Sequence, residues 1–107
     1  MIRFPRVARI AAVAFGAGLA LPAALAQDML QARNLAATCA NCHGTDGNAL
    51  GAMKPLAGMQ ADRLLAILVD YKSGALPATV MHQIAKGYSD EQLRLIAGYF
   101  QSQRARP

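Results

Sequence analysis

Apolar residues recur at intervals of three and four in the middle of the chain, which is the spacing of one face of a helix. The first such stretch predicts a helix over residues 28–41, and the second predicts a helix over residues 62–71 that ends near Gly74. The apolar positions are Ala32, Leu35, Ala36, Cys39 and Ala40 in the first stretch, and Leu64, Leu65, Ile67, Leu68 and Tyr71 in the second.

A third helix is signalled most clearly, in the last quarter of the chain. Residues 89–92 resemble a capping box with acidic residues in the first turn, and an apolar face follows them. Gly98 lowers helix propensity, so we expect it to permit a close crossing with the first helix. The residues expected at this crossing are Ala32 and Ala36 on the first helix and Tyr99 or Phe100 on the last.

The segments between these helices carry turn-forming residues. The Gly-rich stretch 44–58 predicts an irregular loop, and a short helical turn is expected over residues 82–85, after the loop 74–77. No segment from residue 27 onward shows the alternation of a strand. The sequence therefore predicts an all-α domain with three main helices and a short one.

The first 26 residues have a different pattern. Three arginines precede an apolar run over residues 10–21, and Pro22 then separates this run from a small-residue segment that ends at Ala26. This order predicts a bacterial secretory signal peptide over residues 1–26, cleaved after Ala26, and a periplasmic domain over residues 27–107. The alternative is an uncleaved membrane anchor, but a spanning helix needs about 20 apolar residues. No later segment is long and apolar enough to cross a bilayer.

Export changes the charge balance of the chain. The formal net charge of +5 includes the three arginines of the first segment, whereas residues 27–107 hold eight basic and six acidic residues, a net charge of +2. So small an excess gives no electrostatic basis for nucleic-acid binding. The 81 residues of this part are a marginal size for an unaided core, so a cofactor, metal or disulfide is expected.

One motif carries candidate chemistry. Residues 39–43 read Cys-Ala-Asn-Cys-His, the CxxCH pattern of covalent haem attachment. Side chains three and four residues apart share a helix face, so the thiols of Cys39 and Cys42 can reach the two vinyl groups along one side of a porphyrin. His43 then lies beneath the ring, where its imidazole can bind the iron. A single motif predicts one covalently attached haem c per chain.

Two other interpretations of the motif are a disulfide and a zinc site. A thioredoxin-type disulfide between Cys39 and Cys42 requires a βαβ pattern, which the chain lacks. A zinc site formed by these cysteines with His43 and His82 requires adjacent residues to share one ion, although neighbours on a helix point about 100° apart.

A histidine that binds a metal normally donates its second ring proton to a carbonyl or carboxylate. We expect the carbonyl of Pro55, in the loop after the motif, to be the acceptor for His43. The alternative is that Pro55 is an ordinary turn residue.

Electron-transfer haems carry a second axial ligand, and a methionine thioether in that position raises the reduction potential. The methionines after residue 26 are Met29, Met53, Met59 and Met81. Met29 lies too near the His43 side of the ring, whereas Met53 and Met59 lie in or beside the loop and remain candidates.

Met81 follows the loop 74–77, a connection that can carry its side chain to the far face of the haem. Core packing is the alternative role for any lone methionine. His82 is a rival for the same position on the iron, and it is expected at the surface if Met81 binds.

Several segments of the chain resemble the class I c-type cytochromes. They are residues 40–44, 55–58, 71–74, 81–85 and 89–100. The resemblance covers nearly all of residues 28–103. It is strongest to the halves of cytochrome c4 and to the monohaem cytochrome subunit of flavocytochrome c sulfide dehydrogenase.

This resemblance implies the class I cytochrome c fold packed around a covalent haem. It also implies Met81 as the sixth ligand of the iron and Pro55 as the carbonyl partner of His43. The chain departs from the family at Ala75 and Leu76, where relatives often carry a basic residue.

The expected function is single-electron transfer. One version makes the domain the haem subunit that accepts electrons from a sulfide-oxidising flavoprotein, and a second makes it a free electron shuttle of the cytochrome c4 or c5 type. A third alternative is a haem protein with an open sixth site, which follows if Met81 does not bind. Lys54, Lys72 and Lys86 either border a partner-docking patch or are solvated lysines without a partner.

Overall fold

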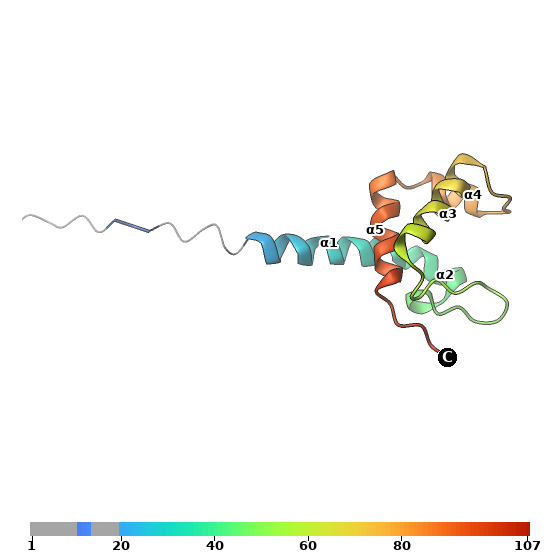
Figure 1. The fold of residues 1–107 in the computed structure, drawn as a ribbon, viewed down its shortest axis with the longest axis horizontal. Coiled ribbons are helices and arrows are strands. Elements are labelled where there is room, and N and C mark those ends of the chain that lie inside the picture. The colour runs from blue at the N-terminus through green and yellow to red at the C-terminus, as the bar shows by residue number, and fades with distance from the viewer. Residues whose placement is uncertain (1–10, 14–19) are drawn as a thin grey trace, which may run out of the picture.

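The computed structural model describes residues 11–13 and 20–107, and their regular elements are all helices (Figure 1). The α-helices are α1 (Ala20–Ala36), α2 (Ala40–His43), α3 (Ala61–Ser73), α4 (Met81–Lys86) and α5 (Asp90–Gln101), and two 3₁₀ turns, η1 (Ala37–Cys39) and η2 (Thr45–Gly47), flank α2. The predicted all-α class is confirmed. Within the described ranges, no helix has the length and apolar character needed to span a bilayer.

The core lies where α5 crosses α1 and packs against α3, and α4 also packs against α3. Ala32 and Ala36 are buried on α1, and Phe100 is 1% exposed on α5. The predicted crossing of the first and last helices is therefore confirmed. The buried residues of the core are Ala36, Leu64, Leu68, Leu93, Ile96, Ala97 and Phe100.

The capping box that begins α5 is also confirmed. The Ser89 hydroxyl accepts a hydrogen bond from the Gln92 backbone N–H at 3.1 Å, and the Gln92 side chain accepts one from the Ser89 N–H at 2.9 Å. Two backbone donors that the helix cannot satisfy itself are thereby paired.

The role predicted for Gly98 is wrong. Gly98 is exposed, and a Cβ atom added there would meet no atom within 4 Å. Its neighbour Ala97, which is 1% exposed, is the small residue that faces the core. The close crossing therefore depends on alanines on both helices.

We therefore expect Gly98→Ala to stabilise the protein by about 0.5–1 kcal/mol, because alanine loses less backbone entropy in a helix. Chemical denaturation of the purified protein measures the change. Gly47→Ala is the matched control and should destabilise, because Gly47 has a φ of +77° and an added Cβ would lie 2.8 Å from the Phe100 ring. A less stable G98A protein would contradict the assignment.

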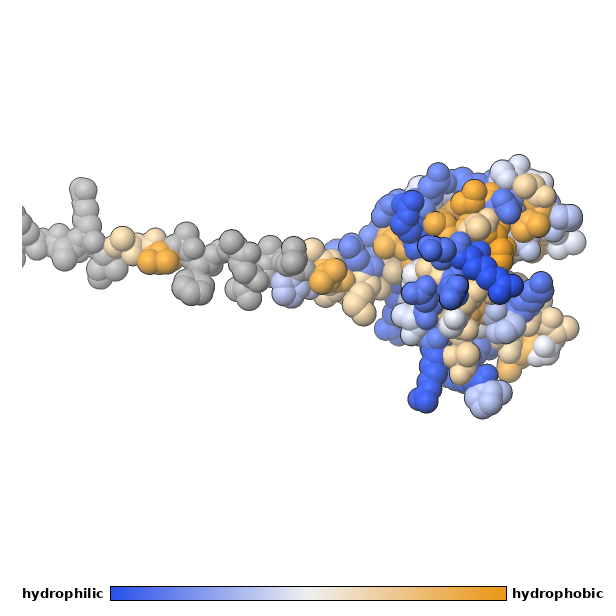
Figure 2. Space-filling view, viewed as in Figure 1, coloured by the Kyte–Doolittle hydropathy of each residue, from blue (hydrophilic) through white to orange (hydrophobic). Residues whose placement is uncertain are grey.

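The predicted signal peptide falls largely on residues 1–10 and 14–19, which lie outside the described residues. The described helix α1 begins earlier than the predicted residue 28 and runs past Ala26 without a break. Its first half projects from the helical body (Figure 1), and apolar residues are exposed along it (Figure 2). Leu25 is 62% exposed, and Met29, just past the midpoint of the helix, is 73% exposed.

Candidate functional site

The CxxCH motif lies at the end of the first helical segment, where α1 is followed by a 3₁₀ turn and one last α-helical turn. Cys39 closes the 3₁₀ turn η1, and Cys42 and His43 lie on the single turn α2. Gly44 follows with φ +79° and ψ 165°, a conformation that is essentially restricted to glycine. A Cβ atom there would lie 2.0 Å from the backbone oxygen of Asn48. The helix therefore ends directly after His43.

The loop after the motif is held by the C-terminal helix. The Tyr99 hydroxyl donates to the Asp46 carboxylate at 2.5 Å, and Asp46 has a left-handed φ of +54°. Burial, followed by the hydrogen bond to Asp46 and the charge of Asp46, raises the pKa of Tyr99. The hydroxyl therefore keeps its proton at neutral pH, and α5 fixes the turn next to His43.

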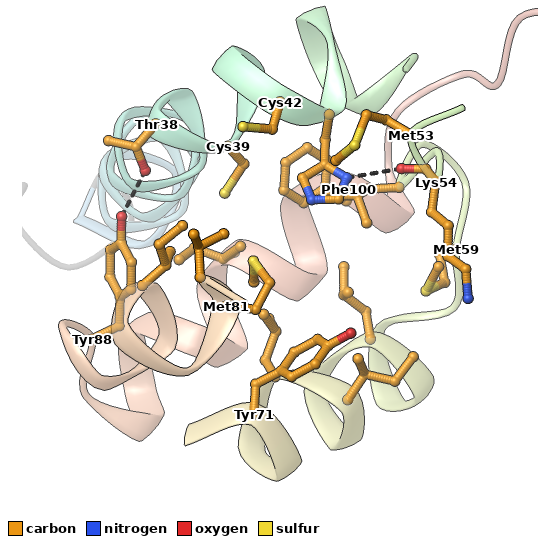
Figure 3. Close-up of a pocket in the computed structure, with 18 of the residues that line it drawn as sticks. Thr38, Cys39, Cys42, Met53, Lys54, Met59, Tyr71, Met81, Tyr88 and Phe100 are labelled. Carbon is orange, nitrogen blue, oxygen red and sulfur yellow. Dashed lines mark hydrogen bonds between the residues drawn. The ribbon is translucent and has the colours of Figure 1, made fainter. Parts of the chain in front are cut away.

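His43 has a defined proton arrangement. Its Nδ1 lies 2.8 Å from the backbone oxygen of Lys54, and because a carbonyl only accepts, Nδ1 must donate (Figure 3). In the neutral imidazole, Nε2 then carries the free lone pair that a metal requires. Within the part of the chain that the structure describes, Nε2 has no hydrogen-bond partner.

The acceptor for His43 is thus the carbonyl of Lys54, and the prediction of Pro55 is wrong by one residue. Pro55 still contributes, because a residue that precedes proline is restricted to extended conformations. This restriction on Lys54 limits the directions in which its carbonyl can point.

A cavity of about 580 Å³ separates the motif from α3 and α4. Cys39, Cys42, His43 and Met81 all line it, so the structure brings the four predicted site residues together. Most of the remaining wall is apolar and comes from Leu56, Leu64, Ile67, Leu68, Val80, Ile84, Ile96 and Phe100. A cavity of this size and character is typical of a site for a small molecule or cofactor.

Both thiols are free and reach the cavity wall. Cys39 is partly buried, whereas Cys42 is exposed. Burial raises the pKa of the Cys39 thiol, with a smaller opposing effect from the Thr38 hydroxyl. No three His, Cys, Asp or Glu side chains among the described residues form a metal site by themselves. A haem needs no such cluster, because the porphyrin supplies the other ligands of its iron.

Three of the four candidate methionines line the cavity, namely Met53, Met59 and Met81. Met29 is 73% exposed on α1 and does not line it. Met81 projects into the cavity from the side that carries Tyr71, whereas Met53 and Met59 lie on the side of Lys54 (Figure 3). Met81 is therefore the methionine that faces the motif across the cavity.

His82 is not the surface residue that the sequence suggested. Its ring is half-buried, it contacts the edge of the Tyr71 ring at a centroid distance of 6.3 Å, and its Nε2 lies 2.6 Å from the Leu76 carbonyl. It does not line the cavity. His82 thus fastens the start of α4 to the preceding loop.

The Lys72 side chain is bound within the chain. Its ammonium donates to the Tyr88 carbonyl at 2.8 Å and to the Asp90 carboxylate at 2.9 Å. Lys54 and Lys86, the other two candidate docking lysines, are exposed.

The Lys72 hydrogen bond and charge lower the pKa of Asp90 below its usual 3.8.

This pKa shift predicts a pH-dependent contribution to stability. A carboxyl whose pKa falls on folding stabilises the protein above its usual pKa, and the contribution disappears as the pH falls through the folded-state value. Asp90→Asn should therefore be less stable than the wild type at pH 7, and the difference should close below pH 3.8. Denaturation midpoints of both proteins between pH 2 and pH 7 measure it, and a constant difference across this range would contradict the assignment.

The pairing of Thr38 with Tyr88 was not anticipated. Both residues line the cavity, and their hydroxyl oxygens lie 2.6 Å apart. They are separated by 50 positions in the chain, so no local pattern connects them.

No family model matches the chain. The chain is 42% identical over 66 residues to the cytochrome subunit of sulfide dehydrogenase from Chlorobaculum tepidum, a match that covers 62% of this chain and 60% of the relative. It is 36% identical over 94 residues to cytochrome c-553 from Nitratidesulfovibrio vulgaris, which covers 83% of this chain and 85% of that protein.

A solved structure of cytochrome c4 from Acidithiobacillus ferrooxidans is also similar. It superimposes with a TM-score of 0.58 at 34% identity, over 60% of this chain and 37% of that one. The chain therefore spans about two-fifths of the cytochrome c4 chain and three-fifths of the sulfide dehydrogenase subunit.

Proposed function

Because the chain belongs to the class I c-type cytochromes, a family of haem-binding electron carriers, we propose that it attaches one haem c covalently through Cys39 and Cys42 and carries single electrons, with His43 and Met81 as axial ligands of the iron. The expected fold, three main helices and a short one around a cofactor cavity, is the fold of this family.

The arrangement of His43 carries the proposal. Its Nδ1 proton is held by the Lys54 carbonyl, which leaves Nε2 as the ring nitrogen available to a metal at the cavity wall. A carbonyl partner of this kind fixes the tautomer and orientation of a ligating imidazole. The residues present therefore fit a haem.

The two thiols complete the attachment. Cys39 and Cys42 would hold the haem through thioether bonds, which would form by addition of each S–H across a vinyl double bond and would consume no oxidant. Neither cysteine is in a disulfide. Met81 projects into the cavity from the opposite wall and would bind the iron through its thioether.

A bound haem supplies a one-electron couple between ferric and ferrous iron. Apolar side chains around the site and fixed ligands leave little to reorganise when the charge changes. Val80 and Ile84, which flank Met81, line the cavity and are 55% and 41% exposed, so this edge of the site reaches the surface. Electrons can leave through this edge.

We propose that the chain works in the periplasm after removal of residues 1–26. The side chains of residues 22–31 are all exposed, and Ala32 is the first buried residue among those described, so cleavage after Ala26 removes no described core contact.

The similarity to a sulfide dehydrogenase subunit favours a flavoprotein that oxidises sulfide as the electron donor. A free electron shuttle is the alternative.

Expression of the full chain together with the haem-attachment machinery tests the proposal. The purified protein should have the mass of residues 27–107 plus one haem, and a redox titration should fit one reversible one-electron step. A chain with the mass of the bare polypeptide and no Soret band would contradict it. Copurification in a fixed ratio with a flavoprotein supports the subunit role, and a monomer that elutes alone supports the shuttle.

A further inference from the structure

Two hydroxyl groups meet at the cavity rim. The Thr38 and Tyr88 oxygens lie 2.6 Å apart in a hydrogen bond in which either hydroxyl can donate, and the Thr38 hydroxyl also lies 3.3 Å from the Leu35 carbonyl. Thr38 directly precedes Cys39, and Tyr88 lies two residues beyond the end of α4. This chain of hydrogen bonds therefore joins the haem-attachment segment to the segment that follows α4 (Figure 3).

The same segment is also held from α3. The Lys72 ammonium donates to the backbone oxygen of Tyr88 and to the carboxylate of Asp90. Tyr88 is thus bound through its side chain to η1 and through its backbone to α3. The connection between α4 and α5 has two independent attachments.

Helix α4 depends on such attachments because it contributes little to the core. It has six residues, and Ala85 is its one buried side chain. The His82 ring fastens its first turn to Leu76, and Tyr88 fastens the segment after its last turn. Met81 is the first residue of this helix.

We propose that Thr38 and Tyr88 are positioning residues that hold α4, and with it Met81, at a fixed separation from the haem-attachment segment. This inference rests on the proposed function, because it assigns the pair a role in keeping Met81 on the iron. Loss of either hydroxyl removes one of the two attachments of the segment after α4 and loosens it, while the Lys72 bond to the Tyr88 backbone remains.

Displacement of the sixth ligand by imidazole tests the proposal. The ferric holoprotein is titrated with imidazole, and loss of the weak far-red band of the sulfur–iron bond is followed. Tyr88→Phe and Thr38→Val should each increase imidazole affinity about two- to tenfold, the range expected for one lost hydrogen bond. The double variant should show no further increase, because both changes remove the same contact.

Ser102→Ala is the matched control, because it removes a hydroxyl bond of similar length, 2.7 Å to the Tyr99 carbonyl, at the end of α5 and outside the cavity lining. It should leave imidazole affinity unchanged, and Thr38→Ser should behave as the wild type. Unchanged affinity in Y88F and T38V, or an equal increase in S102A, would overturn the proposal. If no methionine binds the iron, the wild type itself lacks the far-red band, and if another methionine binds it, Met81→Ala keeps the band, so failure of the proposed function is recognised separately. Either single variant suffices if the other does not fold.

Discussion

Replacing both Cys39 and Cys42 by alanine is expected to give a protein that retains no haem after denaturation. The same protein is expected to lose the helical fold. The two thiols are the chain's only cysteines, and both reach the cavity wall. Without them the cofactor is free to dissociate, and the cavity of about 580 Å³ is left without its occupant.

The magnitude of this effect follows from the size of the cavity. Voids in protein cores cost about 24 cal/mol per Å³, so an empty space of this size costs on the order of 10 kcal/mol. That is comparable to the whole stability of a typical domain, about 5–15 kcal/mol. Collapse or hydration of the cavity reduces the cost but requires the surrounding helices to move. Far-ultraviolet circular dichroism of the double variant should therefore show a large loss of helix.

The single variants separate attachment from folding. Cys39→Ala and Cys42→Ala each keep one thiol, so each should retain one thioether bond and the haem mass after denaturation. Mass spectrometry of the denatured proteins measures attachment, and the dichroism of the same samples measures helix content. A double variant that still carries the haem mass would refute the assignment of these cysteines.

Features encoded by short stretches of sequence were predictable. The capping box at Ser89 and the helix around Leu64 and Leu68 follow from local patterns and helical periodicity. The crossing of the first and last helices was predicted correctly, but from Gly98, which does not lie in it. Predicting that the CxxCH residues and Met81 line one cavity depended on the family resemblance. Met81 is far from the motif along the chain, and no local sequence pattern connects the two.

Features that depend on contacts between distant segments were not predictable. The sequence indicates Pro55 as a conspicuous loop residue, but the carbonyl that accepts the hydrogen bond from His43 belongs to Lys54. Gly98 was assigned to the helix crossing from its low helix propensity, but propensity does not show which face a residue occupies. The contact between Thr38 and Tyr88 depends on how α4 packs, which no local pattern encodes.

Replacing Met81 by alanine is expected to remove the far-red band, to convert the ferric iron to a high-spin state, and to lower the reduction potential. Axial ligands set haem potentials over a range of about 0.8 V, so loss of a thioether should produce a fall on the order of 0.1 V. The thioether stabilises the ferrous state, and its removal favours the ferric state. Absorption spectra and potentiometric titration of the purified variant measure both changes.

Met53→Ala and Met59→Ala are the matched controls, because these residues line the same cavity and lose the same group. Both lie on the side of Lys54, which also holds the His43 ring, so neither faces the motif as Met81 does. They should keep the far-red band and a potential close to that of the wild type. If M59A or M53A loses the band and M81A keeps it, the ligand is reassigned to that methionine. If the wild type is already high-spin, the iron has an open site, and the chain binds small ligands where an electron carrier would hold a sixth side chain.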